Sequence, residues 1–217
     1  MHKSKITRIS LDLETMSLED NAAIIQIGAC VINNHSDPIL AHKPFNIHIN
    51  PKSSEAFGLH VDKGTMEWWS TQDESTRSIV FGGVIDLSSA LSSFHIWCLE
   101  VCGDGNLNDL KIYTKGEQDI TWLKNAYYAA HGSYPFKYYV GQNTRTLNDV
   151  CKYLDIEYPK YAPLVKHDAL EDAISQGKRI EWILDRLDEM QVEASHGNIS
   201  LKNIRNLDIN QSTNVKE

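Results

Sequence analysis

The sequence predicts a single α/β domain in which a mixed β-sheet is flanked by helices. Three strand patterns lie near the start of the chain, and helical patterns alternate with short strand patterns after them. No linker or internal repeat divides the 217 residues, and a chain of this length can bury a sizeable core. We therefore expect one domain over 1–193, followed by a polar, Asn-rich tail over 194–217 that is peripheral or mobile.

Three segments near the N-terminus have strand patterns. Residues 6–14 alternate between apolar and polar side chains, which indicates a strand with one buried face. Residues 24–32 are rich in β-branched side chains, and the short turn before them favours an antiparallel hairpin. Residues 45–49 alternate again and predict a third strand that ends before Pro51.

The remainder of the chain carries helical and short strand patterns in alternation. Apolar residues recur with helical spacing over 63–80 (where the pattern is broken), 87–101, 119–131, 146–154 and 167–190. Either Asp86 or Ser88 can cap the second of these helices. Short strands are expected at 110–113 and 138–140.

Composition and charge exclude several classes of protein. A net charge of −8 excludes an indiscriminate nucleic-acid binder with a basic stripe, but not an enzyme that reaches phosphates through metal ions. Four scattered cysteines without a CxxC pair exclude a zinc ribbon. The N-terminus has no apolar signal region, and the longest nearly apolar run, 22–32, is too short to span a bilayer. We expect a reduced, cytoplasmic protein without a membrane partner.

Two acidic motifs are candidates for chemistry, although each has an ordinary explanation when taken alone. Asp12 and Glu14 lie at i and i+2 on the polar face of the first strand, close enough to share a cation. His167 and Asp172 begin the last helix, and both can face one site if His167 lies at or before the first turn. Solvated strand ends and acids that oppose a helix dipole would explain the two motifs equally well.

The order of these motifs along the chain resembles the DEDDh family of RNase H-like (DnaQ-like) 3′–5′ exonucleases. The first motif reads LDLET and the last reads HDALEDA. The middle acid of the family is assigned to Asp119 in KGEQDITWL, which follows a short strand and Gly116. The spacing there is one residue short and Gln118 replaces the usual aromatic residue, so Asp109 and Asp104 are rivals.

A finer resemblance is carried by TMEWWSTQDESTR, which looks like the phage exonuclease A (DexA-type) branch and the bacterial Rv2179c-like exoribonuclease branch. The resemblance implies a metal-dependent 3′–5′ exonuclease that releases nucleoside 5′-monophosphates from single-stranded 3′ ends. DNA is slightly favoured over RNA as the substrate. The alternatives are an exoribonuclease with the same site, or a non-catalytic or partner-dependent nucleic-acid-binding subunit.

The candidate ligands are all carboxylates, which repel one another unless cations lie between them. Such ligands suit Mg²⁺ or Mn²⁺, and no Cys/His set for zinc accompanies them. The resemblance implies that Asp12 bridges two ions, that Glu14 and Asp172 complete the site beside the attacking water, and that Asp119 supports the second ion. His167 would be the general base.

Substrate contacts are expected around the metal pair. Thr15 and Met16 directly follow it and would meet the terminal nucleotide. Trp68 and Trp69 are about 100° apart on a helix, so we expect one to pack in the core and the other, assigned as Trp69, to stack on a base. The cations available for a short strand footprint are Lys63, Lys115, Arg145, Lys160 and Lys166. The oligomeric state is left open between a monomer and a homodimer, and a phage-encoded protein would work in the host cytoplasm.

Overall fold

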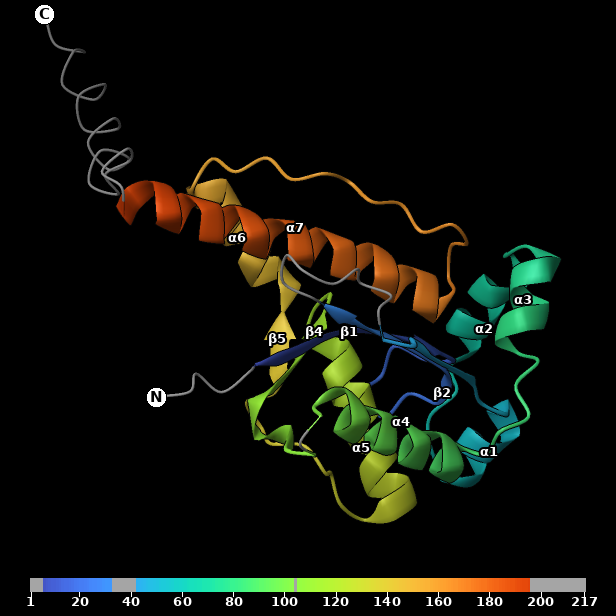
Figure 1. Ribbon diagram of the computed structural model, residues 1–217. Coiled ribbons are helices and arrows are strands. Elements are labelled where there is room, and N and C mark those ends of the chain that lie inside the picture. The colour runs from blue at the N-terminus through green and yellow to red at the C-terminus, as the bar shows by residue number, and fades with distance from the viewer. Residues whose placement is uncertain (1–5, 33–41, 104, 196–217) are drawn as a thin grey trace, which may run out of the picture.

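A computed structural model describes residues 6–32, 42–103 and 105–195, which form a five-stranded mixed sheet with helices on both faces (Figure 1). The strand order is β3-β2-β1-β4-β5. Strand β2 runs antiparallel to both of its neighbours, β3 and β1, whereas β1, β4 and β5 run parallel to one another. The strands are β1 (Thr7–Thr15), β2 (Ile24–Ile32), β3 (Phe45–His48), β4 (Leu110–Thr114) and β5 (Gly141–Asn143). The predicted mixed sheet and its first hairpin are confirmed.

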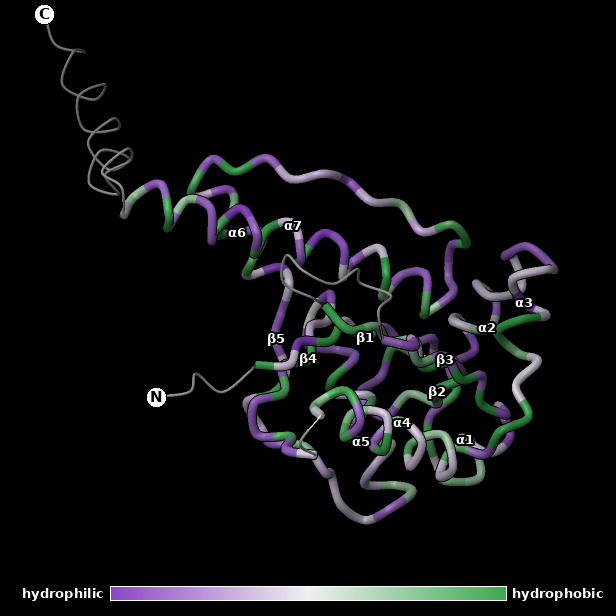
Figure 2. The backbone as a smooth tube through the Cα atoms, in the orientation of Figure 1, coloured by the Kyte–Doolittle hydropathy of each residue, from purple (hydrophilic) through white to green (hydrophobic). Residues whose placement is uncertain are grey.

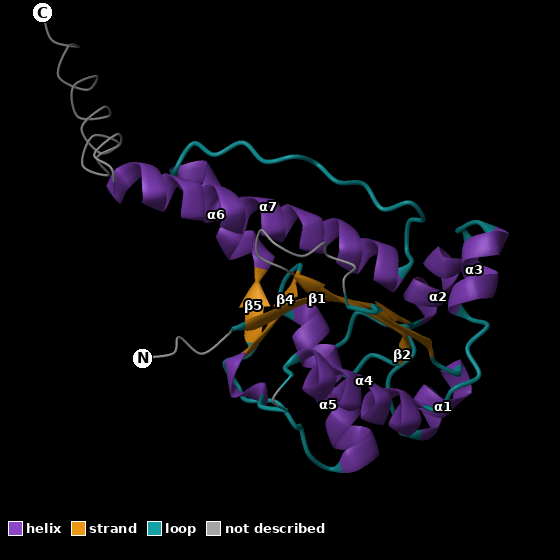
Figure 3. Ribbon diagram, in the orientation of Figure 1, coloured by secondary structure: helices purple, strands orange, loops and turns teal. Residues whose placement is uncertain are grey.

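The helices form two layers around this sheet (Figure 3). The long helix α7 (Ala169–Ser195) covers one face of β1 and β2, and α4 (Leu87–Val101) and α5 (Gln118–His131) cover the other face. The remaining helical segments are α1 (Pro51–Ala56), α2 (Lys63–Ser70), α3 (Glu74–Val80), η1 (Leu107–Asp109) and α6 (Thr144–Tyr153). Figure 2 shows hydrophobic and hydrophilic segments alternating along α7, as expected of a helix with one buried side.

The core lies mainly between the sheet and the α4–α5 layer. Ile9, Leu11 and Leu13 of β1 point into it, as their alternation predicts. Opposite them, Phe94 of α4 packs edge-on against Phe45 of β3 at a centroid distance of 5.3 Å. Asp86 accepts a hydrogen bond from Ser89 N (2.9 Å) and caps α4, so the first of the two predicted capping residues is the one used.

One strand prediction is wrong. Residues 138–140 form a turn in which the Tyr138 side chain is 96% exposed, and the edge strand β5 follows at Gly141–Asn143. Its polar sequence pairs in parallel with β4 through backbone groups, so side-chain alternation does not reveal it. The expected tail boundary at 193 falls inside α7, which continues to Ser195, and 196–217 lie outside the described residues.

Among the described residues, no helix combines the length and the apolar character needed to cross a membrane.

Candidate metal centre and nucleic-acid site

Three carboxylates meet where β1 emerges beneath the start of α7. Asp12 and Glu14 project from the face of β1 that α7 covers, and Asp172 projects from the first turns of α7. One oxygen from each lies within 4.8 Å of the other two. A set of hard oxygen donors at this spacing fits a divalent cation such as Mg²⁺ or Mn²⁺.

The approach of α7 to the sheet depends on Gly28 of β2, the residue paired directly with Asp12. A Cβ atom at Gly28 would lie 2.2 Å from the backbone carbon of Ala169. No real side chain tolerates that distance, so only glycine allows the backbone at the start of α7 to lie this close to β2. A lone glycine inside a strand indicates that another backbone approaches closely. The sequence therefore carried a signal for Gly28, a positioning residue that sequence reasoning missed.

Gln26, which pairs with Glu14 across the hairpin, fixes the same helix start from within the sheet. Its Oε1 accepts a hydrogen bond from Ala169 N (3.2 Å) and its Nε2 donates to Asp168 Oδ2 (3.1 Å). The other oxygen of Asp168 caps α7 by accepting from the backbone N–H of Leu170 at 3.1 Å. Asp168 is thus a structural cap, and the fully buried Gln26 is a second positioning residue that sequence reasoning missed.

A further glutamine holds α7 one turn beyond Asp172. Nε2 of the buried Gln176 donates to Ser10 Oγ (2.9 Å) and to the carbonyl oxygen of Tyr113 (3.1 Å). These bonds join α7 to both β1 and β4. The hydrogen bonds of Gln26 and Gln176 hold α7 to the sheet on either side of Asp172. The spacing of the carboxylates is therefore fixed by the sheet itself and not by a loop.

Asp119 is the middle acid that the structure brings to this centre. It lies in the first turn of α5, is 8% exposed, and its Oδ1 accepts a hydrogen bond from Leu13 N (3.2 Å), between Asp12 and Glu14. It lines the same pocket as Asp12 but stands outside the tight group of three. Asp109 precedes β4, whose start pairs with Thr7, so it lies at the far end of the sheet. Asp104 lies outside the described residues.

Burial and mutual repulsion raise the pKa values of the acids in this cluster. Burial, and then the charges of Asp172 and Asp119, raise the pKa of Glu14 to about 8. Burial and three neighbouring carboxylates likewise raise the pKa of Asp12 well above its ordinary value, and burial raises that of Asp119 to about 6. Burial also raises the pKa of Asp172, although His167 opposes this shift. Without cations, Glu14 therefore holds its proton near neutral pH.

His167 lies two residues before α7 and has a left-handed backbone with φ of +60°. Its imidazole meets the indole of Trp68 edge to face, with centroids 4.9 Å apart, and that of Trp69 at 6.2 Å. A non-glycine residue in this backbone region is uncommon, and histidine is among those that tolerate it. The position before the first turn is the one that lets His167 and Asp172 face the same site.

The two tryptophans of α2 have different environments. Trp69 is 1% exposed, and its Nε1 donates to the carbonyl oxygen of Thr15 (2.9 Å). Trp69 lines the pocket beside Glu14, but a ring this deeply buried offers little surface to a base, so its burial does not support the expected stacking by Trp69. Trp68 is 43% exposed and is the ring available for stacking. Spacing along a helix shows that the rings diverge, but not which of them turns inward.

A pocket of about 450 Å³ borders the carboxylates on the side of Glu14. We call it the tryptophan pocket; its lining residues are Leu13, Glu14, Thr15, Leu18, Asp62, Gly64, Thr65, Trp68, Trp69 and Trp122. Thr15 belongs to it as expected. Met16 does not, because its side chain is 2% exposed and packs in the core, which corrects the expectation of a substrate contact.

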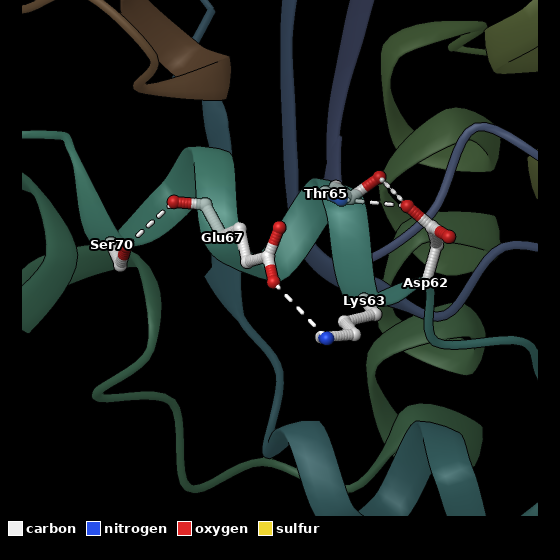
Figure 4. A network of polar contacts seen from close by, with 5 residues as sticks. All are labelled: Asp62, Lys63, Thr65, Glu67 and Ser70. Carbon is white, nitrogen blue, oxygen red and sulfur yellow. Dashed lines mark hydrogen bonds and ion pairs between the residues drawn. The ribbon is translucent and has the colours of Figure 1, made fainter.

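Helix α2, which carries both tryptophans, is ordered at its start by Asp62 (Figure 4). A carboxylate oxygen of Asp62 accepts hydrogen bonds from Thr65 N (2.6 Å) and Thr65 Oγ1 (3.0 Å). Farther along, Lys63 pairs with Glu67 at 3.5 Å, and Ser70 Oγ donates to the Glu67 carbonyl oxygen. The cap gives the wall of the tryptophan pocket a fixed position beside Glu14.

Comparison with protein families identifies the framework. The family model described as "3'-5' exoribonuclease Rv2179c-like domain" matches residues 7–184, from β1 through most of α7. The chain belongs to the Rv2179c-like family. The predicted resemblance is thereby confirmed at the family level, whereas its phage exonuclease A detail is unsupported. A search of the curated proteins gives no match.

Solved structures place the Rv2179c-like chain in the RNase H-like fold of DEDDh exonucleases. Escherichia coli Exonuclease I in complex with a dT13 oligonucleotide has 13% identity and a TM-score of 0.63; the match covers 86% of this chain but only 42% of that one. The nuclease domain of 3'hExo, a DEDDh family member bound to rAMP, has 15% identity and a TM-score of 0.52, with 85% and 92% covered. Pop2p of S. pombe, in its Mg²⁺- and Mn²⁺-bound form, has 13% identity and a TM-score of 0.51; the match covers 82% of this chain and 83% of that one.

Proposed function

We propose that the protein is a metal-dependent 3′–5′ exonuclease that removes nucleoside 5′-monophosphates from the 3′ end of single-stranded nucleic acid. The observation that carries this proposal is the group of Asp12, Glu14 and Asp172 within 4.8 Å, on the framework of an exonuclease family. The exoribonuclease description of the family favours RNA. The sequence-based preference for DNA stays a prediction that the same assay tests.

Asp12, Glu14 and Asp172 would hold divalent ions, Mg²⁺ or Mn²⁺, and we propose two per site with Asp119 supporting the second. Such ions, when bound, stabilise the charge on the attacking and leaving oxygens of a phosphodiester. The raised pKa values of these acids support this role, because a cation offsets the repulsion that burial makes costly.

We assign His167 as the general base that takes a proton from the attacking water. It stands before α7 with Asp172 in the first turn that follows, and an imidazole is the side chain most often used for general base catalysis. The tryptophan pocket beside Glu14 would receive the 3′-terminal nucleoside, with its base on the exposed indole of Trp68.

The test is an incubation of the purified protein with 5′-labelled single-stranded RNA and DNA of matched sequence, with Mg²⁺, with Mn²⁺ and with chelator. We expect a metal-dependent ladder that shortens from the 3′ end, and the faster substrate decides between the two sugars. Asp12→Asn should abolish the ladder. His167→Asn should lose turnover while it keeps metal-dependent binding of the labelled strand. A labelled strand of full length in every wild-type lane, with binding retained, would instead identify a non-catalytic or partner-dependent subunit.

A further inference from the structure

A second pocket, of about 630 Å³, borders the carboxylates on the side of Asp12 and Asp119. We call it the basic pocket after its two cations, Lys115 and Arg145, which line it together with Asn143 and with the carboxylates of Asp12, Asp119 and Glu117. It differs in chemistry from the tryptophan pocket on the side of Glu14, whose wall is dominated by indole rings. The candidate centre therefore lies between a pocket lined by indole rings and a pocket that offers two cations.

The sheet brings the two cations of the basic pocket together. Strands β4 and β5 are parallel, and Thr114 is in register with Asn143, so the residues that follow each strand emerge at the same edge. The guanidinium of Arg145 lies over Gly116, with Cζ only 3.8 Å from the point where a Cβ would be. Asn143 fixes the start of α6 by accepting a hydrogen bond from Arg145 N (2.9 Å).

Neither cation forms an ion pair with an anion among the described residues, whereas Lys63 pairs with Glu67 and Lys152 pairs with Asp149. Both side chains are exposed at the rim. Of the five cations that the sequence offers for a strand footprint, these two line a pocket beside the acids.

Lys115 also stands close to the acidic centre. Burial raises the pKa of Asp12, Asp119 and Asp172, and the charge of Lys115 opposes the shift of all three. An ammonium group this close to the acids, but without an ion pair to any of them, is placed for an anion adjoining the reaction centre.

We propose that Lys115 and Arg145 bind the phosphodiester on the 5′ side of the scissile one, so that the strand enters along the basic pocket. This inference rests on the proposed exonuclease function. A 3′-terminal nucleoside carries no phosphate besides the scissile group, so the pocket that receives it needs base contacts and not cations. The remaining strand carries a charge at every linkage and fits the cationic side.

The test uses short oligonucleotides of one sequence in which a single linkage is a neutral methylphosphonate. For the wild-type protein, neutralising the linkage next to the scissile one should lower kcat/KM about tenfold, and a distal neutral linkage should have little effect. In Arg145→Gln and Lys115→Gln this penalty should shrink to about twofold, because the cation that reads the charge is gone. Lys152→Gln, on the same helix as Arg145 and with the same charge change, should keep the wild-type penalty.

Two results would overturn the proposal: a full penalty in both variants, or an equal penalty at both linkages in the wild type. Arg145 is exposed, so its variant remains informative if Lys115→Gln fails to fold. If the wild type cleaves none of these strands, the exonuclease function fails. In that case the affinities of the same labelled strands in Ca²⁺, measured by fluorescence anisotropy, still decide whether the two cations read that linkage.

Discussion

The indole of Trp68 meets the imidazole of His167 edge to face, with ring centroids 4.9 Å apart and planes at 88°. The ring centroid of Trp69 lies 6.2 Å from that of His167, and Trp69 is hydrogen-bonded to Thr15 at the end of β1. The residue assigned as the general base is therefore oriented by α2, a helix distant from α7 in sequence. The same exposed indole lines the tryptophan pocket, so in the proposed function one side chain would serve both substrate binding and orientation of the base.

Removal of this ring should affect both steps. Trp68→Ala is expected to raise KM for a labelled single-stranded substrate about tenfold, because one stacked base is worth about 1–3 kcal/mol. It should also lower kcat, because the imidazole loses the ring that orients it. Trp68→Phe retains an aromatic edge and should recover most of kcat. Steady-state kinetics on the three proteins measure the split.

A change in KM alone, with kcat unchanged in Trp68→Ala, would restrict the indole to stacking. Because Trp68 is 43% exposed, the variant should remain folded, and a thermal melt verifies this. Unchanged KM and kcat would remove both roles.

The middle acid is tested by a matched pair of variants. Asp119→Asn keeps the shape of the side chain and removes its negative charge, and it should lower metal affinity and kcat by about tenfold or more. Asp109→Asn makes the same chemical change at the opposite end of β4 and should leave both near the wild-type values. Metal titrations followed by activity measure the contrast. Equal losses of metal affinity and kcat in the two variants would show that Asp119 has no specific role in the metal centre.

The sequence predicts those parts of the site that local periodicity determines. Alternation along β1 places Asp12 and Glu14 on one face, and a helical pattern begins beside His167. The relation of Asp119 to Leu13 depends on the parallel pairing of β1 with β4, which no local pattern encodes. For this reason the middle acid had rivals in the sequence.

Other features depend on register or on the direction of a side chain in three dimensions. The polar strand β5 pairs through its backbone, so its sequence carries no strand pattern. The choice between Trp68 and Trp69 is set by which ring finds the core, and helical spacing gives only their divergence. Gly28 and Gln26 become meaningful only when the hairpin register places them opposite the two acids of β1.

Gly28 can be tested through the close approach that it permits. Gly28→Ala would place a Cβ 2.2 Å from the Ala169 backbone, so α7 must move. Overpacking of this kind costs about 1–3 kcal/mol of unfolding free energy, measurable by urea denaturation. Because Asp172 moves with α7, the variant should also lose the rise in Tm that Mg²⁺ gives the wild type.

A control on the opposite face of β2 separates stability from site geometry. Ala29→Gly removes a buried methyl group and should cost about 1 kcal/mol, but it leaves the start of α7 in place. It should therefore keep the Mg²⁺-dependent rise in Tm. If Gly28→Ala keeps that rise too, the glycine does not set the position of Asp172.

The raised pKa of Glu14 makes the stability of the metal-free protein depend on pH. Its pKa rises from an ordinary 4.5 to about 8, first through burial and then through neighbouring carboxylates, so the folded state binds more protons than the unfolded state between these values. Stability in chelator should therefore fall as pH rises across that window. Mg²⁺ should reverse this fall, with a larger rise in Tm at about pH 8 than at about pH 6.

Glu14→Gln removes the titrating group and should flatten the slope in chelator while it abolishes turnover. Thermal melts of both proteins, with and without Mg²⁺, test this relation, and a wild-type Tm in chelator that rises steadily up to about pH 8 would contradict it.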